Sequence, residues 1–239
     1  MPGNTLKLRN IVLLASSVVC MNNAQARYVH SDVASVRVHQ SIKSAGALAP
    51  AAINSAENNK ATNVIMLAVK FVEFADDKNT PVLSRDSANV VIAEINQIYS
   101  QCQLKLTLQD YQIVTPADVG LDYSTRSMDE LDGIRAPFNT AKELVVINTG
   151  PWDHAGMGVA NAWTAMPGET LSGAVIEAPV AGDAPLVAHE LGHYLSLDHV
   201  ADEGNIMNPI VYDTSKRIDP YQCLAMRQTA QSVLSLVIR

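Results

Sequence analysis

HELGHYLSLDH (residues 189–199) carries more information about fold and chemistry than any other part of the chain. His189 and His193 are four residues apart, so on an α-helix they lie one turn apart on the same face. Two imidazoles in this arrangement can bind one Zn²⁺ ion, at roughly 2.0–2.1 Å each. Glu190 follows the first histidine and can point at the open coordination position, where water would bind. The spacing therefore predicts a helix that carries two metal ligands and a base.

His199 is the candidate for a third ligand. It comes six residues after His193, and on a continuous helix its side chain would point off the metal-binding face. The helix must therefore end near Ser196, and the chain must fold back. Three neutral imidazoles leave a fourth position for water, as in catalytic zinc sites. We predict zinc ligation by His189, His193 and His199, with Glu190 as the catalytic base.

This stretch resembles the signature of the metzincin zinc peptidases, H-E-x-x-H-x-x-G-x-x-H followed by a methionine turn. The turn corresponds to NIMNP (residues 205–209), in which Met207 comes eight residues after His199. This spacing, and the proline two residues after the methionine, are most similar to the matrixin branch. The resemblance implies a peptidase with peptide or protein substrates and a methionine that forms an apolar floor under the zinc. Ser196 departs from the family pattern, which has glycine there; a left-handed non-glycine residue costs about 1–2 kcal/mol.

The first 26 residues have the features of a secretory signal peptide. Lys7 and Arg9 form a small positive region, residues 11–21 are apolar, and Ala24-Gln25-Ala26 fits a cleavage site. The apolar run is too short to span a bilayer. We therefore expect an exported protein, secreted or periplasmic, that has no stable membrane anchor once the signal is removed.

The remaining chain is expected to comprise an arm and one catalytic domain. Residues 27–60 are rich in Ala, Ser, Asn and Val and are expected to form a mobile arm or a short pro-segment. This arm contains no cysteine, which excludes latency through a cysteine thiolate on the zinc. Residues 61–239 are expected to form the metallopeptidase domain. The formal net charge of −7 argues against nucleic acid as a partner.

Two cysteines, Cys102 and Cys223, remain after signal removal. In an oxidising compartment an even pair in a small domain favours a disulfide, and the chain-entropy model gives a long loop of this kind about 3–5 kcal/mol. The alternative is two separately buried thiols.

Hydrophobic periodicity outlines the elements of the domain. Strands are expected at 64–74, 104–108, 143–148 and 173–179, an edge strand at 159–164, and helices at 88–102, 184–196 and from 219 onward. Residues 127–136 are expected to be a short helix or an irregular loop. The resemblance implies an α+β, metzincin-like zincin fold. Its parts are a twisted, mostly parallel sheet with an antiparallel edge strand, an active-site helix, a methionine turn and a C-terminal helix.

The sequence predicts an exported zinc-dependent endopeptidase. Two alternatives stay open: a zinc amidase acting on cell-wall peptides, and a non-catalytic zinc-bearing binding protein. Tyr212 lies in the segment that, in the resembled family, walls a substrate pocket, and it is a candidate for the pocket or for donation to the oxyanion. Asp153-His154 hints at a second metal, but such a pair in a glycine-rich loop is usually turn chemistry, and no site is assigned.

Overall fold

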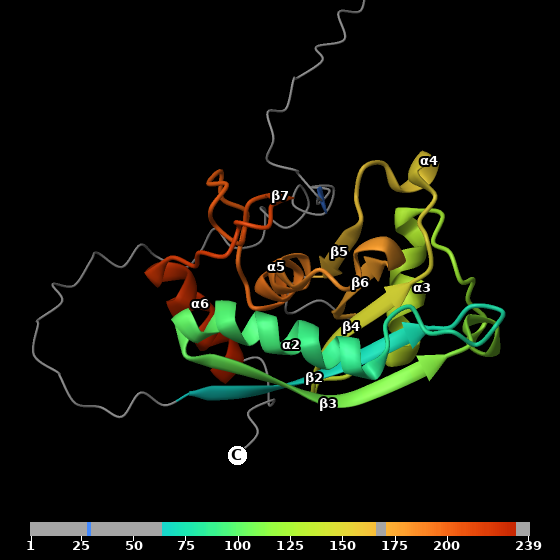
Figure 1. Ribbon diagram of the computed structural model, residues 1–239, viewed down its shortest axis with the longest axis horizontal. Helices are drawn as coiled ribbons and strands as arrows, with labels where there is room; N and C mark the ends of the chain where they lie inside the picture. The colour runs from blue at the N-terminus through green and yellow to red at the C-terminus, as the bar shows by residue number, and fades with distance from the viewer. Residues whose placement is uncertain (1–27, 30–63, 166–170, 233–239) are drawn as a thin grey trace, which may run out of the picture.

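The computed structural model describes residues 28–29, 64–165 and 171–232 (Figure 1). The predicted signal peptide, residues 1–26, lies outside the described residues, as does all of the predicted arm except two residues.

A five-stranded sheet forms the centre of the domain, in the order β3-β2-β4-β6-β5. The first four strands run parallel, and β5 pairs with β6 antiparallel at the edge. The strands are β2 Ile65–Phe74, β3 Leu104–Val114, β4 Leu144–Thr149, β5 Ala162–Ala165 and β6 Gly173–Glu177. The continuous apolar runs of β2 and β4 suit a parallel sheet that is covered on both faces.

Helices and short 3₁₀ segments connect the strands. The helices are α2 Arg85–Tyr99, α3 Leu131–Arg135, α4 His154–Met157, α5 Ala184–Tyr194 and α6 Pro220–Ser232. The 3₁₀ segments are Ser100–Cys102, Pro116–Val119, Met128–Glu130, Ala136–Phe138 and Ala178–Val180. The predicted α+β class, with a mostly parallel sheet, an antiparallel edge strand, an active-site helix and a C-terminal helix, is confirmed.

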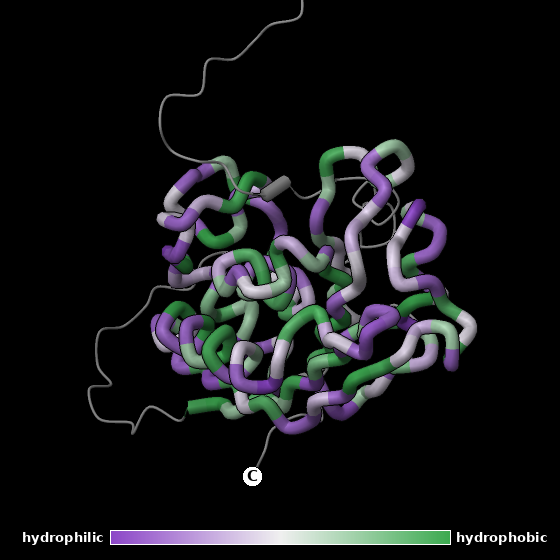
Figure 2. The backbone as a smooth tube through the Cα atoms, turned by 45° about the vertical axis from the view of Figure 1, so that its right-hand side comes forward, coloured by the Kyte–Doolittle hydropathy of each residue, from purple (hydrophilic) through white to green (hydrophobic). Residues whose placement is uncertain are grey.

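The sheet separates two hydrophobic clusters. One face of the sheet packs against α2, α5 and α6, and the opposite face packs against α3 and the loops around it. The tube in Figure 2 changes colour repeatedly within single elements, as expected when each element turns one side to the core and the other to solvent. Among the described residues, no helix is long and apolar enough to cross a membrane.

A second, two-stranded sheet joins the start of the predicted arm to the segment after the methionine turn. β1, Tyr28–Val29, pairs antiparallel with β7, Ile210–Val211, which follows the methionine turn. Figure 1 shows β1 beside β7, on the same side of the sheet as α5. The arm or pro-segment expected over 27–60 stays a prediction, and β1 could not be recognised in the sequence, because a two-residue strand leaves no periodic signal.

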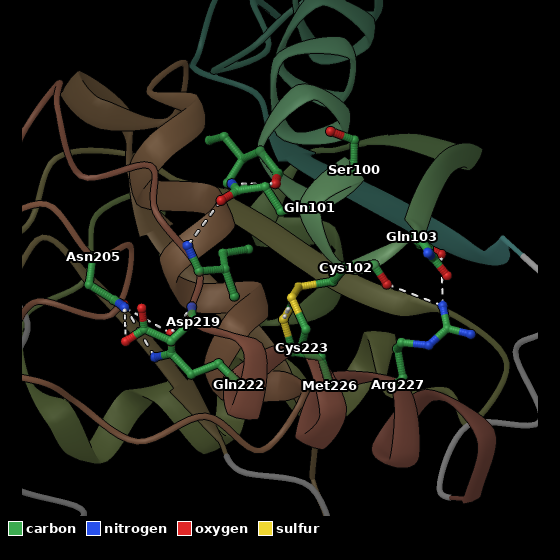
Figure 3. Close-up of a disulfide and its surroundings, with 12 residues drawn as sticks. Ser100, Gln101, Cys102, Gln103, Asn205, Asp219, Gln222, Cys223, Met226 and Arg227 are labelled. Atoms are coloured by element: carbon green, nitrogen blue, oxygen red, sulfur yellow. Dashed lines mark hydrogen bonds between the residues drawn. A yellow bond between two sulfur atoms is a disulfide. The ribbon is translucent and has the colours of Figure 1, made fainter. Parts of the chain in front are cut away.

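The predicted disulfide between Cys102 and Cys223 is present (Figure 3). It joins the 3₁₀ segment after α2 to the first turn of α6, across 121 residues of sequence. Arg227 of α6 donates to the carbonyl oxygens of Cys102 and Gln103, each at 3.1 Å, so a second contact fixes the helix at the same place.

Candidate active site

Helix α5 begins where its sequence provides a cap. The Asp183 carboxylate accepts the backbone N–H of Leu186 at 2.9 Å, and Pro185 occupies the first turn, where its missing N–H costs little. All eleven residues of Ala184–Tyr194 are buried. The helix therefore lies between other elements rather than on the surface.

Helix α2 holds α5 from the side of the core. The Tyr99 hydroxyl donates to the Ala188 carbonyl at 2.7 Å, one residue before the first predicted ligand. Burial, and then the negative charge of Glu190, raise the pKa of Tyr99 well above its usual value. The hydroxyl therefore stays protonated and keeps its role as donor.

The end of α5 is the chain reversal that the third histidine requires. Ser196 has φ of 68°, in the left-handed region. Its N–H donates to the His193 carbonyl at 2.9 Å, and the Leu197 N–H donates to the Gly192 carbonyl at 3.0 Å. These two bonds are the Schellman pattern of helix termination, which usually has glycine at the left-handed position. The expectation that the helix ends near Ser196 is confirmed, with serine in the strained conformation.

This reversal brings three imidazoles together. The Nε2 atoms of His189, His193 and His199 lie 3.0, 3.1 and 3.3 Å from one another. The Nδ1 atom of His189 lies 2.8 Å from the Ile206 carbonyl, and that of His193 lies 2.8 Å from the Leu197 carbonyl. A carbonyl can only accept, so Nδ1 carries the proton in both rings and Nε2 presents a lone pair.

The donor set fits a zinc ion. Nitrogen ligands at 2.0–2.1 Å from a tetrahedral ion lie about 3.3 Å from one another, close to the observed separations. Lone pairs that face each other this closely repel unless a cation lies between them. Among the residues that the structure describes, these three histidines form the one group of three or more possible ligands within metal-binding distance. The Nδ1–H···O=C bonds are the outer contacts that orient ligating imidazoles in metal sites.

Glu190 is fully buried beside the first ligand. Its Oε2 atom accepts a hydrogen bond from the Thr164 hydroxyl of β5 at 2.6 Å. The carboxylate is thus held by the edge strand of the sheet as well as by its own helix. The sequence motif identified Glu190 but gave no sign of Thr164, because only the fold brings β5 against α5.

The methionine turn packs against helix α5. Met207 is fully buried, and a Cβ atom added at Gly192 would meet the Met207 sulfur at 2.5 Å. The Asn205 side chain accepts the Met207 N–H at 2.9 Å, and the Met207 carbonyl accepts the Val200 N–H at 2.9 Å. The turn is therefore tied to the chain on both sides of the site.

Tyr212 directly follows β7, where it is half-buried, and its N–H donates to the Ser215 hydroxyl at 3.0 Å. The structure thus places Tyr212 on the segment after the methionine turn. Its role at a pocket or an oxyanion stays a prediction.

Asp153 and His154 have local partners. The Asp153 carboxylate caps α4 by accepting the Ala155 N–H at 3.0 Å, and His154 Nδ1 lies 3.0 Å from the Gly158 carbonyl. The other ring nitrogen, Nε2, lies 3.6 Å from Glu177. These contacts agree with the interpretation of the pair as turn chemistry.

Comparison with known families gives one match. Residues 85–200 match the family described as Metallo-peptidase family M12B Reprolysin-like. The matched region is just under half of the chain, begins with α2 and includes all three histidines and Glu190. It supports a metallopeptidase of the metzincin kind and does not confirm the matrixin branch.

Solved structures give two further likenesses. Metalloproteinase-II from Bacteroides fragilis is 14% identical over 72% of this chain, with a TM-score of 0.47. The chain spans only 55% of that protein's length. Archaemetzincin from Methanopyrus kandleri is 12% identical, over 70% of this chain and 96% of its own, with a TM-score of 0.48. No curated protein matches the chain.

Proposed function

We propose that the chain is a metallopeptidase, an exported endopeptidase that depends on zinc and uses Glu190 as its general base. The observation that carries the proposal is the convergence of the three Nε2 atoms, with the Glu190 carboxylate on the residue next to the first of them. A purely structural metal site has no need of a buried base at this place.

The proposed reaction is hydrolysis of a peptide bond. Zinc bound by His189, His193 and His199 would polarise the substrate carbonyl and acidify water. The Glu190 carboxylate accepts the proton of the attacking water and then delivers it to the leaving amine. The imidazoles keep their Nε2 lone pairs directed inward because two of the Nδ1 protons are bound to backbone carbonyls.

The edge strand β5 is the proposed binding site for the substrate backbone. Among the strands that the structure describes, it pairs with β6 alone, so its other edge is proposed to add an extended peptide as a further strand. Main-chain hydrogen bonds of this kind bind any peptide, while pockets select side chains. On the other side of α5, β7 and Tyr212 are proposed to form the wall of such a pocket.

Replacement of Glu190 tests the proposal. We expect Glu190→Ala to keep its zinc content and to lose peptide cleavage by a factor of about 10²–10⁴, because the proton acceptor is removed. A chelator should abolish wild-type cleavage, and added zinc should restore it. Cleavage of a mixed peptide library, with zinc content measured in parallel, gives both results. Glu203→Ala, in the exposed loop after the site, is the matched control and should cleave as the wild type does.

Other outcomes would contradict the proposal. Equal cleavage by wild type and Glu190→Ala at equal zinc content would favour a zinc-bearing binding protein. Hydrolysis of peptidoglycan fragments without hydrolysis of unfolded protein would favour a cell-wall amidase.

Export and the arrangement of the chain complete the proposal. Export through a signal over residues 1–26 agrees with the disulfide, since disulfides persist in oxidising compartments. We also propose an arm or pro-segment over 27–60 and a catalytic domain over 61–239. We propose a secreted or periplasmic location, and cleavage after Ala26 should give an N-terminus at Arg27 by protein sequencing. Within the metzincins, we propose the matrixin branch, on the basis of the number of residues between His199 and Met207.

A further inference from the structure

We propose that Thr164 of β5 is a positioning residue, which holds the Glu190 carboxylate in the orientation that proton transfer requires. The inference rests on the proposed function of Glu190. It assigns a second side chain, which lies outside the histidine motif and far from it in the sequence, to the same reaction.

The contact between the two residues is short and buried. The Thr164 hydroxyl lies 2.6 Å from Glu190 Oε2, and the two residues are 4% and 0% exposed. Hydrogen bonds to ionised carboxylates are shorter and about twice as strong as neutral ones, and a low local dielectric strengthens them further.

The strand fixes the hydroxyl in place. Thr164 pairs with Ala174 of β6, and its neighbours Trp163 and Ala165 pack into the cluster on the opposite face of the sheet. Alternation along the strand therefore directs the Thr164 side chain toward α5. Its branched Cβ also restricts rotation about χ1. The donor is built into the sheet before substrate arrives.

A fixed donor has a clear effect on a glutamate. A glutamate side chain has three rotatable bonds, and ordering it costs free energy on each turnover unless a neighbour holds it. Preorganised polar contacts avoid that cost at the moment of reaction. A hydroxyl that donates to Oε2 orients the whole carboxylate relative to the three imidazoles.

The same contact links catalysis to substrate binding. β5 is the strand proposed to pair with the substrate backbone, and Thr164 lies on it. The strand that aligns the peptide therefore also aligns the base that acts on it.

Two substitutions at Thr164 separate its hydroxyl from its shape. Thr164→Val keeps the volume and branching but removes the donor, whereas Thr164→Ser keeps the donor. We expect kcat to fall roughly tenfold or more in Thr164→Val, with KM and the zinc Kd unchanged within about twofold. Thr164→Ser should restore most of the lost kcat. Thr107→Val, on the far edge strand β3, is the matched control and should leave kcat unchanged.

A double-mutant cycle adds a measurement that needs no activity. In the zinc-free protein, Thr164→Val should lower the denaturant midpoint when Glu190 is present and should not lower it in a Glu190→Ala background. Such coupling, together with the loss of kcat and its rescue by serine, would support the proposal.

Three results would overturn it: an unchanged kcat in Thr164→Val, no rescue by serine, or an equal midpoint loss in both backgrounds. The last would make Thr164 a packing residue. A different result would contradict the proposed function itself: the double-mutant cycle shows coupling between Thr164 and Glu190, but the wild type cleaves no peptide. The positioning role would then be contradicted as well.

Discussion

Glu73 carries a carboxyl group inside β2, which lies between β3 and β4 in the sheet. It is fully buried and accepts hydrogen bonds from the Asn148 side-chain amide at 2.7 Å and from the Leu83 N–H at 2.9 Å. Burial raises the pKa of Glu73 to about 8, although both hydrogen bonds act in the opposite direction. At neutral pH the folded protein therefore holds this carboxyl mostly in its protonated form.

The raised pKa predicts a specific dependence of stability on pH. The ordinary pKa of 4.5 lies below the folded value, so the folded protein binds more protons than the unfolded chain between these two values. The contribution of Glu73 is complete below pH 4.5 and is lost as pH rises toward 8. Its slope is at most about 1.4 kcal/mol per pH unit.

Glu73→Gln should remove this slope, because glutamine stays neutral. Denaturant unfolding of zinc-free protein between pH 5 and 8.5 measures it as the difference between wild type and variant. Glu94→Gln, at an exposed position of α2, is the control and should unfold in parallel with the wild type. Parallel curves for wild type and Glu73→Gln would show that Glu73 has no raised pKa.

At the residue scale, local spacing in the sequence predicted that the three histidines meet, and the structure brings them together. The three histidines, Glu190 and Met207 stand at fixed distances along the chain, and a helix followed by a turn is enough to bring them together. Thr164 could not be found in this way, because its contact with Glu190 depends on the packing of β5 against α5.

Ser196 is the residue at which the sequence departs from the family pattern, which has glycine there. The pattern alone therefore did not predict the left-handed turn after α5. In the structure the backbone adopts the left-handed conformation with serine, because two hydrogen bonds of the helix end and the burial of Leu197 stabilise the reversal.

At the element scale, the contact between α5 and the methionine turn depends on the absence of a side chain at Gly192. A Cβ there would lie 2.5 Å from the Met207 sulfur and 3.4 Å from its terminal methyl carbon. Met207 is fully buried, so its side chain has little room to move. The turn and the helix therefore lie closer together than any other residue type would allow.

Gly192→Ala should destabilise the protein by about 1–3 kcal/mol, despite the better helix propensity of alanine. Because the neighbouring Ile206 carbonyl orients the His189 ring, the zinc affinity should also fall. Thermal unfolding and competition with a chelator measure the two effects. Gly133→Ala in α3 is the matched control: its added Cβ meets nothing within 4 Å, so its stability should be unchanged or higher. Equal effects at both glycines would contradict the proposed packing.

The strands of the main sheet and the long helices were predicted, whereas the two-residue strands β1 and β7 were not. β2, β4, α2 and α5 have strong periodicity, and their bounds agree with the sequence to within a few residues. The edge strand begins at Ala162 rather than Val159, because the preceding residues belong to the loop after α4. β1 and β7 are two residues each, and only their pairing across the fold makes them strands.

At the scale of the whole molecule, the disulfide connects the middle of the domain to its last described helix. Cys102 and Cys223 (Figure 3) enclose helix α5, the methionine turn and four of the five strands of the sheet within one covalent loop. The disulfide therefore restricts the unfolded protein over a large part of its length. In the chain-entropy account this restriction is the main source of stabilisation.

The double variant Cys102→Ala/Cys223→Ala should lose about 3–5 kcal/mol in free energy of unfolding. Denaturant unfolding with and without a reductant measures the loss. Reductant should lower the stability of the wild type to near that of the variant and leave the variant unchanged. A wild type indifferent to reductant after confirmed reduction would contradict this account.

The short pair formed by β1 and β7 matters for anyone who prepares this protein. The proposed cleavage after Ala26 leaves one residue before Tyr28, which pairs with Val211 in the strand that follows the methionine turn. An affinity tag or an unprocessed leader would then be joined one residue ahead of that pair. Preparations intended for inhibitor assays should therefore start at the residue that the proposed cleavage exposes.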